Sequence, residues 1–351
     1  MTFHLNRGLP FAEWPAKDRE LWDRALGAKD FFDDSITTDW SQTTRRNMKY
    51  AYSLWLGMLS MLNPQSFALD PSERVTQDAV KEFVESLRVN CRETTIFHSV
   101  ARLHYVLRAI CPEHDWEWVY RLSRRIAAGA ESMQHPQVLS VDLYQVGLRL
   151  MDRAKTTVAA QQRMAKSSAI RYRDGLMIAA LVEAPMRRRP FSQLRLRETV
   201  VKRNGRWVLR VPASLSKTNV AQDYGLSERL TAYMDHFLER IRPVFPGAET
   251  HDFLWPFEGR PMGDKMIRRR IIKRTTEGLG FPVPPHRFRN AAASFVSVAD
   301  PKNIRMAKDL LGHKSFAMTE KHYINAAQSR TAGRELVRLL QARQGIGDAT
   351  A

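Results

Sequence analysis

Between residues 194 and 211 the sequence changes from a helical to a strand-like pattern, and this change constrains the fold more than any other feature. Leu194–Val200 and Trp207–Val211 are β-like, and Asn204-Gly205 between them is a dipeptide that tight hairpin turns prefer. Elsewhere the apolar residues recur at helical spacing. The pattern predicts a mostly α protein with a small β-hairpin, an α+β fold.

The helical segments fall into two groups on either side of a short linker. We expect residues 1–38 to form an arm or a short helix, whose role stays open, and residues 39–127 to form an all-helical domain. Residues 128–138 are the expected linker, and residues 139–351 are expected to form a larger second domain. In the first domain we expect helices at Thr43–Met61, Thr76–Leu87, Thr94–Ile110 and Trp116–Ile126. Asp39-Trp40-Ser41 supplies N-cap candidates for the first of these helices, and Thr76 is the predicted cap of the second. In the second we expect helices at Ser140–Lys155, Ser168–Glu183, Ser227–Arg242, Lys265–Thr276, Arg289–Val298, Asn303–Leu311 and Ser329–Gln344.

The positive charge lies almost wholly in the second part of the chain. The net charge is +18 over 351 residues. Residues 1–138 hold 17 Lys and Arg against 18 Asp and Glu, which leaves 38 against 19 for residues 139–351. A surface this basic favours a polyanionic partner, of which nucleic acid is the common case.

Other classes of protein fit the composition poorly. The sequence has no apolar run long enough to span a membrane, and its first residues do not resemble a signal peptide. Cys91 and Cys111 are too few for a disulfide framework, which favours a reducing, intracellular setting. With His114 they lack the paired spacing of a zinc site, so we expect no metal.

Four islands of basic and hydroxyl side chains lie in the basic part of the chain. They are Ala184–Arg189, Ser216–Thr218, His286–Arg289 and Leu310–Ser315, and Tyr323 follows ten residues after His313. Two Arg, a Lys, two His and a Tyr suit the transfer of a phosphodiester without a metal. Guanidinium groups grip phosphate oxygens and stay charged at any working pH. A Lys or His can protonate the leaving 5′-oxygen, and a phenol can form a covalent phosphoester.

The stretch from His286 to Tyr323 resembles the tyrosine recombinase (phage integrase) family. It contains His-x-x-Arg, then Leu-Leu-Gly-His-Lys-Ser, then Met-Thr-Glu-Lys-His-Tyr, and the resemblance covers about residues 40–345. It implies a SAM-like helical core-binding domain and an integrase-type catalytic domain that form a C-shaped clamp around duplex DNA. It also implies a site-specific recombinase that cuts and rejoins strands through a 3′-phosphotyrosine, without a cofactor, metal or ATP.

The resemblance gives six residues a role. Arg187 and Arg289 match the phosphate-binding arginines, Lys217 the hairpin lysine that acts as general acid, His286 and His313 the two histidines, and Tyr323 the nucleophile.

The match departs from the family pattern at two places. Pro190 stands where a Glu is common three residues after the first arginine, and Asn290 stands where His is frequent. Because Arg188 and Arg189 adjoin Arg187, the register of the first match stays open by one residue. Tyr172 and Tyr224 follow no Gly-His box and are interpreted as core or surface tyrosines.

Further basic residues are candidates for DNA binding: Arg45, Arg46 and Lys49 in the first domain, and Arg268, Arg269, Arg270 and Lys273 in the second. A solvated helix face is an equal alternative for the second group.

The family implies a dimer on each recombination site and a tetramer when two sites pair, with accessory proteins left open and a cytoplasmic, nucleoid-associated location. Helix 329–344 docks on a neighbouring protomer or packs on its own domain. Two other functions remain: a type IB topoisomerase-like relaxing enzyme, and an inactive DNA-binding regulator of the same fold.

Overall fold

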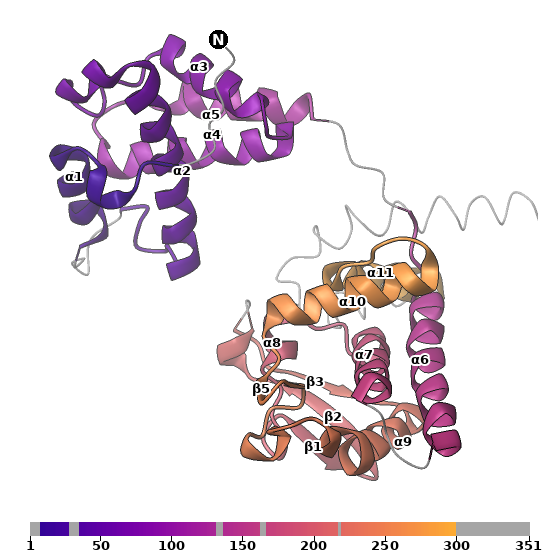
Figure 1. The fold of residues 1–351 in the computed structure, drawn as a ribbon. Helices are drawn as coiled ribbons and strands as arrows, with labels where there is room; N and C mark the ends of the chain where they lie inside the picture. Colours follow the sequence, from indigo (N-terminus) through magenta and orange to yellow (C-terminus); the bar gives the residue numbers. More distant parts are fainter. Residues whose placement is uncertain (1–7, 28–34, 131–135, 162–165, 217–218, 300–351) are drawn as a thin grey trace, which may run out of the picture. The chain divides into compact units, whose positions relative to one another are not determined.

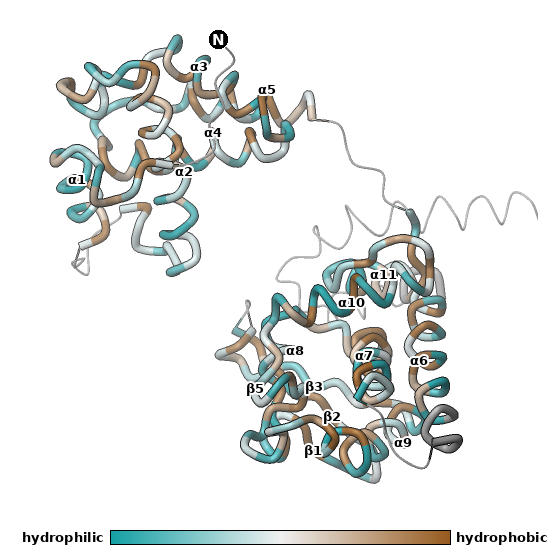
Figure 2. Tube along the Cα trace, in the orientation of Figure 1, coloured by the Kyte–Doolittle hydropathy of each residue, from teal (hydrophilic) through white to brown (hydrophobic). Residues whose placement is uncertain are grey.

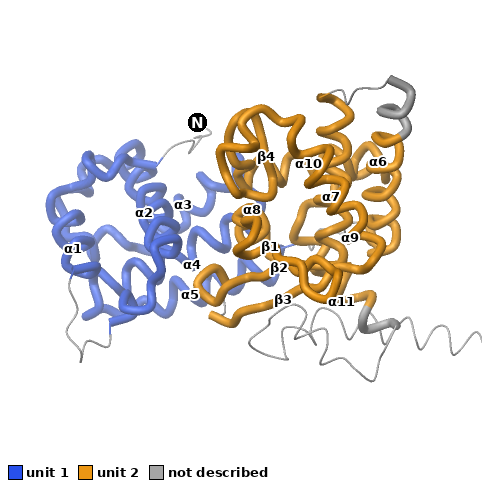
Figure 3. Tube along the Cα trace, turned by 90° about the horizontal axis from the view of Figure 1, so that it is seen from below, with its two compact units in different colours: residues 1–134 blue, residues 135–351 orange. Residues whose placement is uncertain are grey.

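The structure is a computed structural model that describes residues 8–27, 35–130, 136–161, 166–216 and 219–299. The chain divides into two units, residues 1–134 and 135–351, each with its own hydrophobic core (Figure 3). The expected helices at 303–311 and 329–344 lie outside the described residues.

The first unit is helical throughout its described part (Figure 1). Its helices are α1 (Ala16–Leu26), α2 (Gln42–Leu62), α3 (Gln77–Arg88), α4 (Glu93–Ile110) and α5 (Glu117–Ala128). The four helices expected here are confirmed, with ends within two residues of those predicted. The predicted caps also form, because Ser41 and Thr76 each accept a hydrogen bond from a backbone N–H of the first turn.

The segment before α2 belongs to the core of this unit. Trp14 and Trp22 are buried, and the ring centroid of Trp14 lies 5.0 Å from that of Tyr52 on α2. Asp18 of α1 is fully buried and accepts hydrogen bonds from the Tyr52 hydroxyl, at 2.7 Å, and from Arg74, at 2.8 Å. A buried carboxylate needs such partners, so α1 is fixed on the remaining helices of the unit.

The second unit combines helices with two small sheets. Its helices are α6 (Ser140–Gln161), α7 (Lys166–Glu183), α8 (Arg188–Ser192), α9 (Glu228–His236), α10 (Asp264–Leu279) and α11 (Pro285–Ala299). A π-helical turn, Phe237–Ile241, follows α9. Four of the helices expected between residues 140 and 298 are confirmed with the same or longer ends. The helix expected at Ser227–Arg242 is shorter, because α9 ends at His236 and the π-helical turn follows.

The predicted hairpin is present, but its first strand is shorter than expected. β1 (Val200–Arg203) and β2 (Arg206–Val211) pair antiparallel, and Asn204 and Gly205 take the left-handed φ values of 49° and 75° that a tight turn requires. The prediction of a strand from Leu194 was wrong. Residues 195 and 196 form only isolated bridges, because Arg195 pairs with the distant Phe253. The third strand, β3 (Gln222–Gly225), was not predicted, and it pairs with β2.

Helix α7 is the centre of the second core (Figure 2). It packs most extensively against α6 and also contacts α9, α10 and α11. The crossing with α6 is close because two glycines face each other there. A Cβ atom built on Gly175 would lie 2.6 Å from the carbonyl oxygen of Gly147, so any side chain would push the helices apart.

A short hairpin of two two-residue strands, β4 (Pro256–Phe257) and β5 (Arg260–Pro261), precedes α10. Within the described residues no helix is long and apolar enough to cross a membrane.

Candidate active site

The turn between α7 and α8 carries the first basic island. Pro185 and Met186 are buried, whereas Arg187 is partly exposed at the N-cap of α8. Proline disfavours helical geometry in the residue before it and lacks an amide hydrogen, so α7 ends and the chain turns. Arg187 therefore directly follows two buried residues of the turn, Pro185 and Met186.

The three adjacent arginines have different surroundings. Arg188 forms an ion pair with Asp264 at the start of α10, at 2.9 Å, and Arg189 is exposed. Between the described residues, the ion pair of this turn is made by Arg188, and Arg187 forms none with a carboxylate. This division supports Arg187 as the first phosphate-binding arginine.

The second arginine reaches the same turn from α11. Arg289 is buried, with 8% of its surface exposed, and its Nη1 donates a hydrogen bond of 2.5 Å to the carbonyl oxygen of Pro185. His286 lies three residues earlier on α11 and is exposed. Arg187 and Arg289, which are 102 positions apart in the sequence, are thus brought to one place.

A tyrosine that the sequence analysis set aside lies beside both arginines. Tyr224 of β3 is 6% exposed. Burial raises the pKa of its hydroxyl, whereas the positive charges of Arg289 and Arg187 and a hydrogen bond with the Arg289 side chain lower it. Tyr172, by contrast, is a core residue whose hydroxyl donates to the carbonyl of Tyr233. This agrees with its interpretation from the sequence as a core or surface tyrosine.

The remaining three predicted catalytic residues lie outside the described residues. Lys217 falls in the connection between β2 and β3, and His313 and Tyr323 fall after α11. Their roles stay predictions.

The basic run of α10 divides into two groups. Arg268, Arg269 and Lys273 are exposed. Arg270 and Arg274 instead donate to the fully buried carboxylate of Asp174 on α7, with Nε–Oδ2 distances of 3.0 Å in both cases. Arg270 was predicted to contact DNA, but its guanidinium is occupied by this carboxylate, which limits its access to a phosphate.

Asp174 also accepts a hydrogen bond of 2.9 Å from Arg173, the residue before it. Arg173 is itself buried and donates to the carbonyl of Pro256 in β4. Three guanidinium groups therefore meet on the carboxylate of Asp174, which ties α10 and β4 to α7.

The candidates on α2 differ in availability. Arg45 and Arg46 are exposed, and Arg45 donates to the carbonyl of Trp40. The ammonium group of Lys49 lies 3.4 Å from the centroid of the Phe11 ring, a cation–π contact within the unit.

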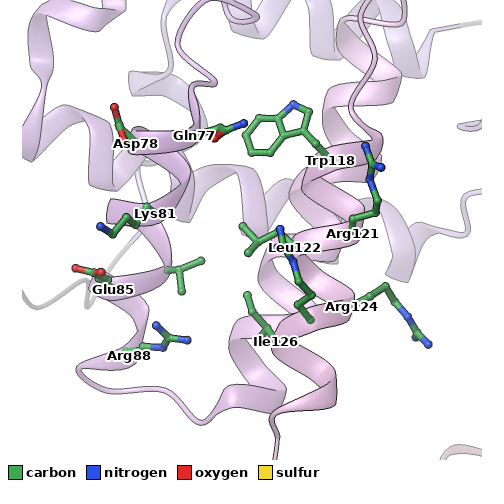
Figure 4. Close-up of a pocket in the computed structure, with 12 residues that line it drawn as sticks. Gln77, Asp78, Lys81, Glu85, Arg88, Trp118, Arg121, Leu122, Arg124 and Ile126 are labelled. Atoms are coloured by element: carbon green, nitrogen blue, oxygen red, sulfur yellow. The ribbon is translucent and has the colours of Figure 1, made fainter.

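A basic groove between α3 and α5 was missed by the sequence analysis (Figure 4). Its volume is about 870 Å³, and Trp118, Leu122 and Ile126 of α5 face α3 across it. Its charged lining residues are Lys81, Arg88, Arg121, Arg124 and Arg125 against Asp78 and Glu85. The signal was present as Arg121, Arg124 and Arg125, but the balanced charge of residues 1–138 concealed it.

Among the described residues no group of three or more His, Cys, Asp and Glu could hold a metal ion.

The first unit is helical, and in the second unit two arginines meet beside a three-stranded sheet. This is the fold of the tyrosine recombinases, a class of DNA strand-transfer enzymes. The profile of the phage integrase family matches residues 149–330, just over half of the chain. The chain belongs to the phage integrase family.

Solved structures agree with the fold. The XerH site-specific recombinase bound to a palindromic difH substrate, in a post-cleavage complex, superposes with a TM-score of 0.57 at 13% identity, over 89% of this chain and 91% of that chain. A lambda integrase (75–356) dimer bound to a core site gives a TM-score of 0.52 at 15% identity, over 85% of this chain and 96% of that chain. A lambda integrase tetramer bound to a Holliday junction gives a TM-score of 0.50 at 17% identity, over 87% of this chain and 76% of that chain. A search of curated proteins by sequence found no match.

Proposed function

We propose that this tyrosine recombinase grips the scissile phosphate of a specific DNA site between Arg187 and Arg289. The observation that carries the proposal is the hydrogen bond from Arg289 to the carbonyl of Pro185, which joins α11 to the turn of Arg187. A guanidinium has five N–H donors, so Arg289 keeps donors for a phosphate after this bond. Two fixed cations stabilise the negative charge that grows on the non-bridging oxygens during transfer.

The chemistry then follows from the remaining predicted residues. The Tyr323 phenol passes its proton to a general base and attacks phosphorus, which forms a 3′-phosphotyrosine and breaks the bond to the 5′-oxygen. Lys217 donates the proton that the leaving 5′-oxygen takes up, and His286 and His313 hydrogen-bond the phosphate. The phosphotyrosine keeps the energy of the broken ester, so a 5′-hydroxyl from a partner strand reverses the step without ATP.

Contacts to the DNA backbone would come from both units. In the second unit the exposed side chains of Arg268, Arg269 and Lys273 lie on one helix. In the first, the groove between α3 and α5 has five cations against two anions, and we add it to the exposed Arg45 and Arg46 as a phosphate-binding surface. A clamp of two units around the duplex would use both surfaces.

The assembly is proposed by analogy with the solved neighbours. Lambda integrase is seen as a dimer on a core site and as a tetramer on a Holliday junction. We infer a dimer on each site and a tetramer when two sites pair, with the segment 329–344 docking on a neighbouring protomer, in a chain that acts on cytoplasmic, nucleoid-associated DNA.

A plasmid test separates recombination from the rival activities. A duplex that binds the chain is selected from random sequences, and two copies are placed on a supercoiled plasmid. We expect recombinant circles with the wild-type chain and none with Tyr323→Phe. Relaxation without recombinants indicates a topoisomerase-like enzyme, and binding without either product indicates a regulator; both outcomes contradict the proposal.

A further inference from the structure

Glu183 is the last residue of α7 and stands four residues before Arg187. The C-terminal end of a helix carries a partial negative charge, which disfavours a carboxylate there. Glu183 is also partly buried, and a buried charge needs hydrogen-bond partners. A carboxylate at this position must therefore be stabilised by other parts of the fold.

The partners of Glu183 come from two other helices. Its Oε2 atom accepts a hydrogen bond of 2.7 Å from the backbone N–H of Ser227, the N-cap of α9, and its Oε1 atom accepts one of 2.7 Å from the Ser227 hydroxyl. Tyr144 of α6 donates its hydroxyl to the same Oε1 atom at 2.6 Å. Both carboxylate oxygens are thus engaged, and the negative charge lies at the N-terminus of α9, where the helix dipole favours it.

The bonds of Glu183 fix the end of α7 directly before the turn that carries Arg187. Three buried residues lie between Glu183 and Arg187, so little chain is free to absorb a movement of the helix end. The middle one of the three, Pro185, provides the carbonyl that binds Arg289. A displacement of the end of α7 would therefore move Arg187 and disturb the bond to Arg289 at the same time.

The start of α9 is itself fixed on the three-stranded sheet. β3 ends two residues before Ser227, and the backbone N–H of Leu226 between them donates to the carbonyl of Trp207 in β2 at 2.8 Å. Through Ser227, Glu183 holds the turn of Arg187 at a fixed place relative to this sheet. Fixed charges stabilise a transition state only when they are in place beforehand, and a displacement of about 1 Å can slow a reaction about 100-fold.

We propose that Glu183 is a positioning residue: its carboxylate joins the end of α7 to the start of α9 and so holds the turn of Arg187 and Arg289 where the two arginines grip the scissile phosphate. This inference rests on the proposed function, in which these arginines bind that phosphate. Glu183 takes no part in the bond changes, because both of its carboxylate oxygens are engaged with Ser227 and Tyr144.

The test measures formation of the covalent complex in a single turnover. The selected duplex is nicked close to the cleavage point, so that the short fragment with the free 5′-hydroxyl diffuses away and the adduct accumulates. Glu183→Gln keeps the size of the side chain but places an amide NH2 group against at least one of the three donors. Tyr144→Phe removes a single donor and leaves the carboxylate in place.

The matched control is Asp235→Asn. Asp235 of α9 is also a carboxylate that joins elements of the second unit, since it accepts hydrogen bonds from Lys202 of β1 at 2.9 Å and from the Trp207 side chain of β2 at 2.8 Å. These bonds join α9 to the sheet and do not involve the end of α7.

We expect Glu183→Gln to slow adduct formation at saturating protein by about 10- to 100-fold, because the guanidinium of Arg187 is displaced. Tyr144→Phe should slow it by about three- to tenfold, since one of three bonds is lost. Asp235→Asn should react at about the wild-type rate. Duplex affinity should stay within about twofold of the wild-type value, because the contacts to the DNA backbone remain.

A wild-type rate for Glu183→Gln overturns the proposal, and so does an equal slowing by Asp235→Asn. If Glu183→Gln does not fold, the rate of Tyr144→Phe decides in the same way.

A second substrate separates positioning from a general loss of folded protein. A methylphosphonate at the scissile position replaces one charged non-bridging oxygen by a methyl group, so less negative charge develops for the two guanidinium groups to stabilise. The ratio of the wild-type rate to the Glu183→Gln rate should then fall below about threefold. An equal ratio on both duplexes means that Glu183 acts on folding alone, and the proposal fails. If the wild-type chain forms no adduct on the unmodified duplex, the proposed function fails first and this inference with it.

Discussion

The Nη1 atom of Arg289 on α11 lies 2.5 Å from the carbonyl oxygen of Pro185, two residues before Arg187. This bond makes the ends of two helices, 104 residues apart in sequence, into one site. The proposed binding of one phosphate by Arg187 and Arg289 therefore depends on the turn after α7 as well as on the two arginines.

The three arginines of the turn are predicted to differ in effect. Arg187→Ala should slow adduct formation by about 100-fold or more, the usual loss when one fixed donor to a developing oxyanion is removed. Arg189→Ala, at an exposed position, should change the rate by no more than a few-fold. Arg188→Ala loses a partly exposed ion pair with Asp264, which costs at most about 1 kcal/mol of stability. If Arg188→Ala or Arg189→Ala is the slow variant in place of Arg187→Ala, the register is wrong.

The groove between α3 and α5 should contribute to the salt dependence of DNA binding. Arg121→Gln and Arg124→Gln should each reduce the slope of log affinity against log salt by about one, because one fewer counterion is released. The control is Arg24→Gln on α1, an exposed arginine that pairs with Glu20. Fluorescence anisotropy at several salt concentrations measures the slopes, and equal slopes for all variants would remove the groove from the interface.

The carboxylate of Asp174 is predicted to stabilise the second unit strongly. Asp174→Asn leaves three guanidinium groups around a neutral side chain, and breaking a buried ion pair in this way costs about 3–5 kcal/mol. The comparison is Glu198→Gln, whose exposed pair with Arg195 is long, at 3.8 Å, and should contribute less than about 1 kcal/mol. Urea unfolding of the two variants gives the difference, and similar free energies of unfolding would contradict it.

The two cysteines should differ in reactivity with pH. Burial raises the pKa of the Cys111 thiol to about 12, so at pH 8 only about one in 10,000 of these groups is the reactive thiolate. Because the shift is upward, the reactive fraction grows only as pH rises toward 12. A thiol reagent should label the partly exposed Cys91 in the native chain and both cysteines in urea. Native labelling of Cys111 at a rate like that of Cys91 would be inconsistent with its burial.

The sequence predicted the features that local chemistry determines. The helix caps at Ser41 and Thr76 and the hairpin turn at Asn204-Gly205 depend on a few neighbouring residues, and all three are confirmed. Strand β3 was missed because Gln222–Gly225 is short and polar, and only its pairing with β2 makes it a strand.

The candidate site was predictable in its residue types and not in its geometry. The surroundings of Arg270 and Tyr224 depend on residues far away in the sequence: Arg270 donates to Asp174, and the charge of Arg289 acts on the Tyr224 hydroxyl. Spacing alone could not distinguish an arginine that faces solvent from one that pairs with a buried carboxylate. For the same reason it could not distinguish Tyr172, in the core, from Tyr224, whose hydroxyl is influenced by the charges of Arg289 and Arg187.

The identity of the residue that becomes linked to DNA tests the central claim most directly. The protein is incubated with a duplex nicked close to the cleavage point, so that the short fragment with the free 5′-hydroxyl diffuses away and the covalent complex accumulates. The complex is digested with protease and nuclease, and the modified peptide is sequenced by mass spectrometry. We predict a 3′-phosphonucleotide on Tyr323 and no adduct with Tyr323→Phe. A linkage to Tyr224 or any other residue, or an adduct that persists in Tyr323→Phe, would contradict this mechanism.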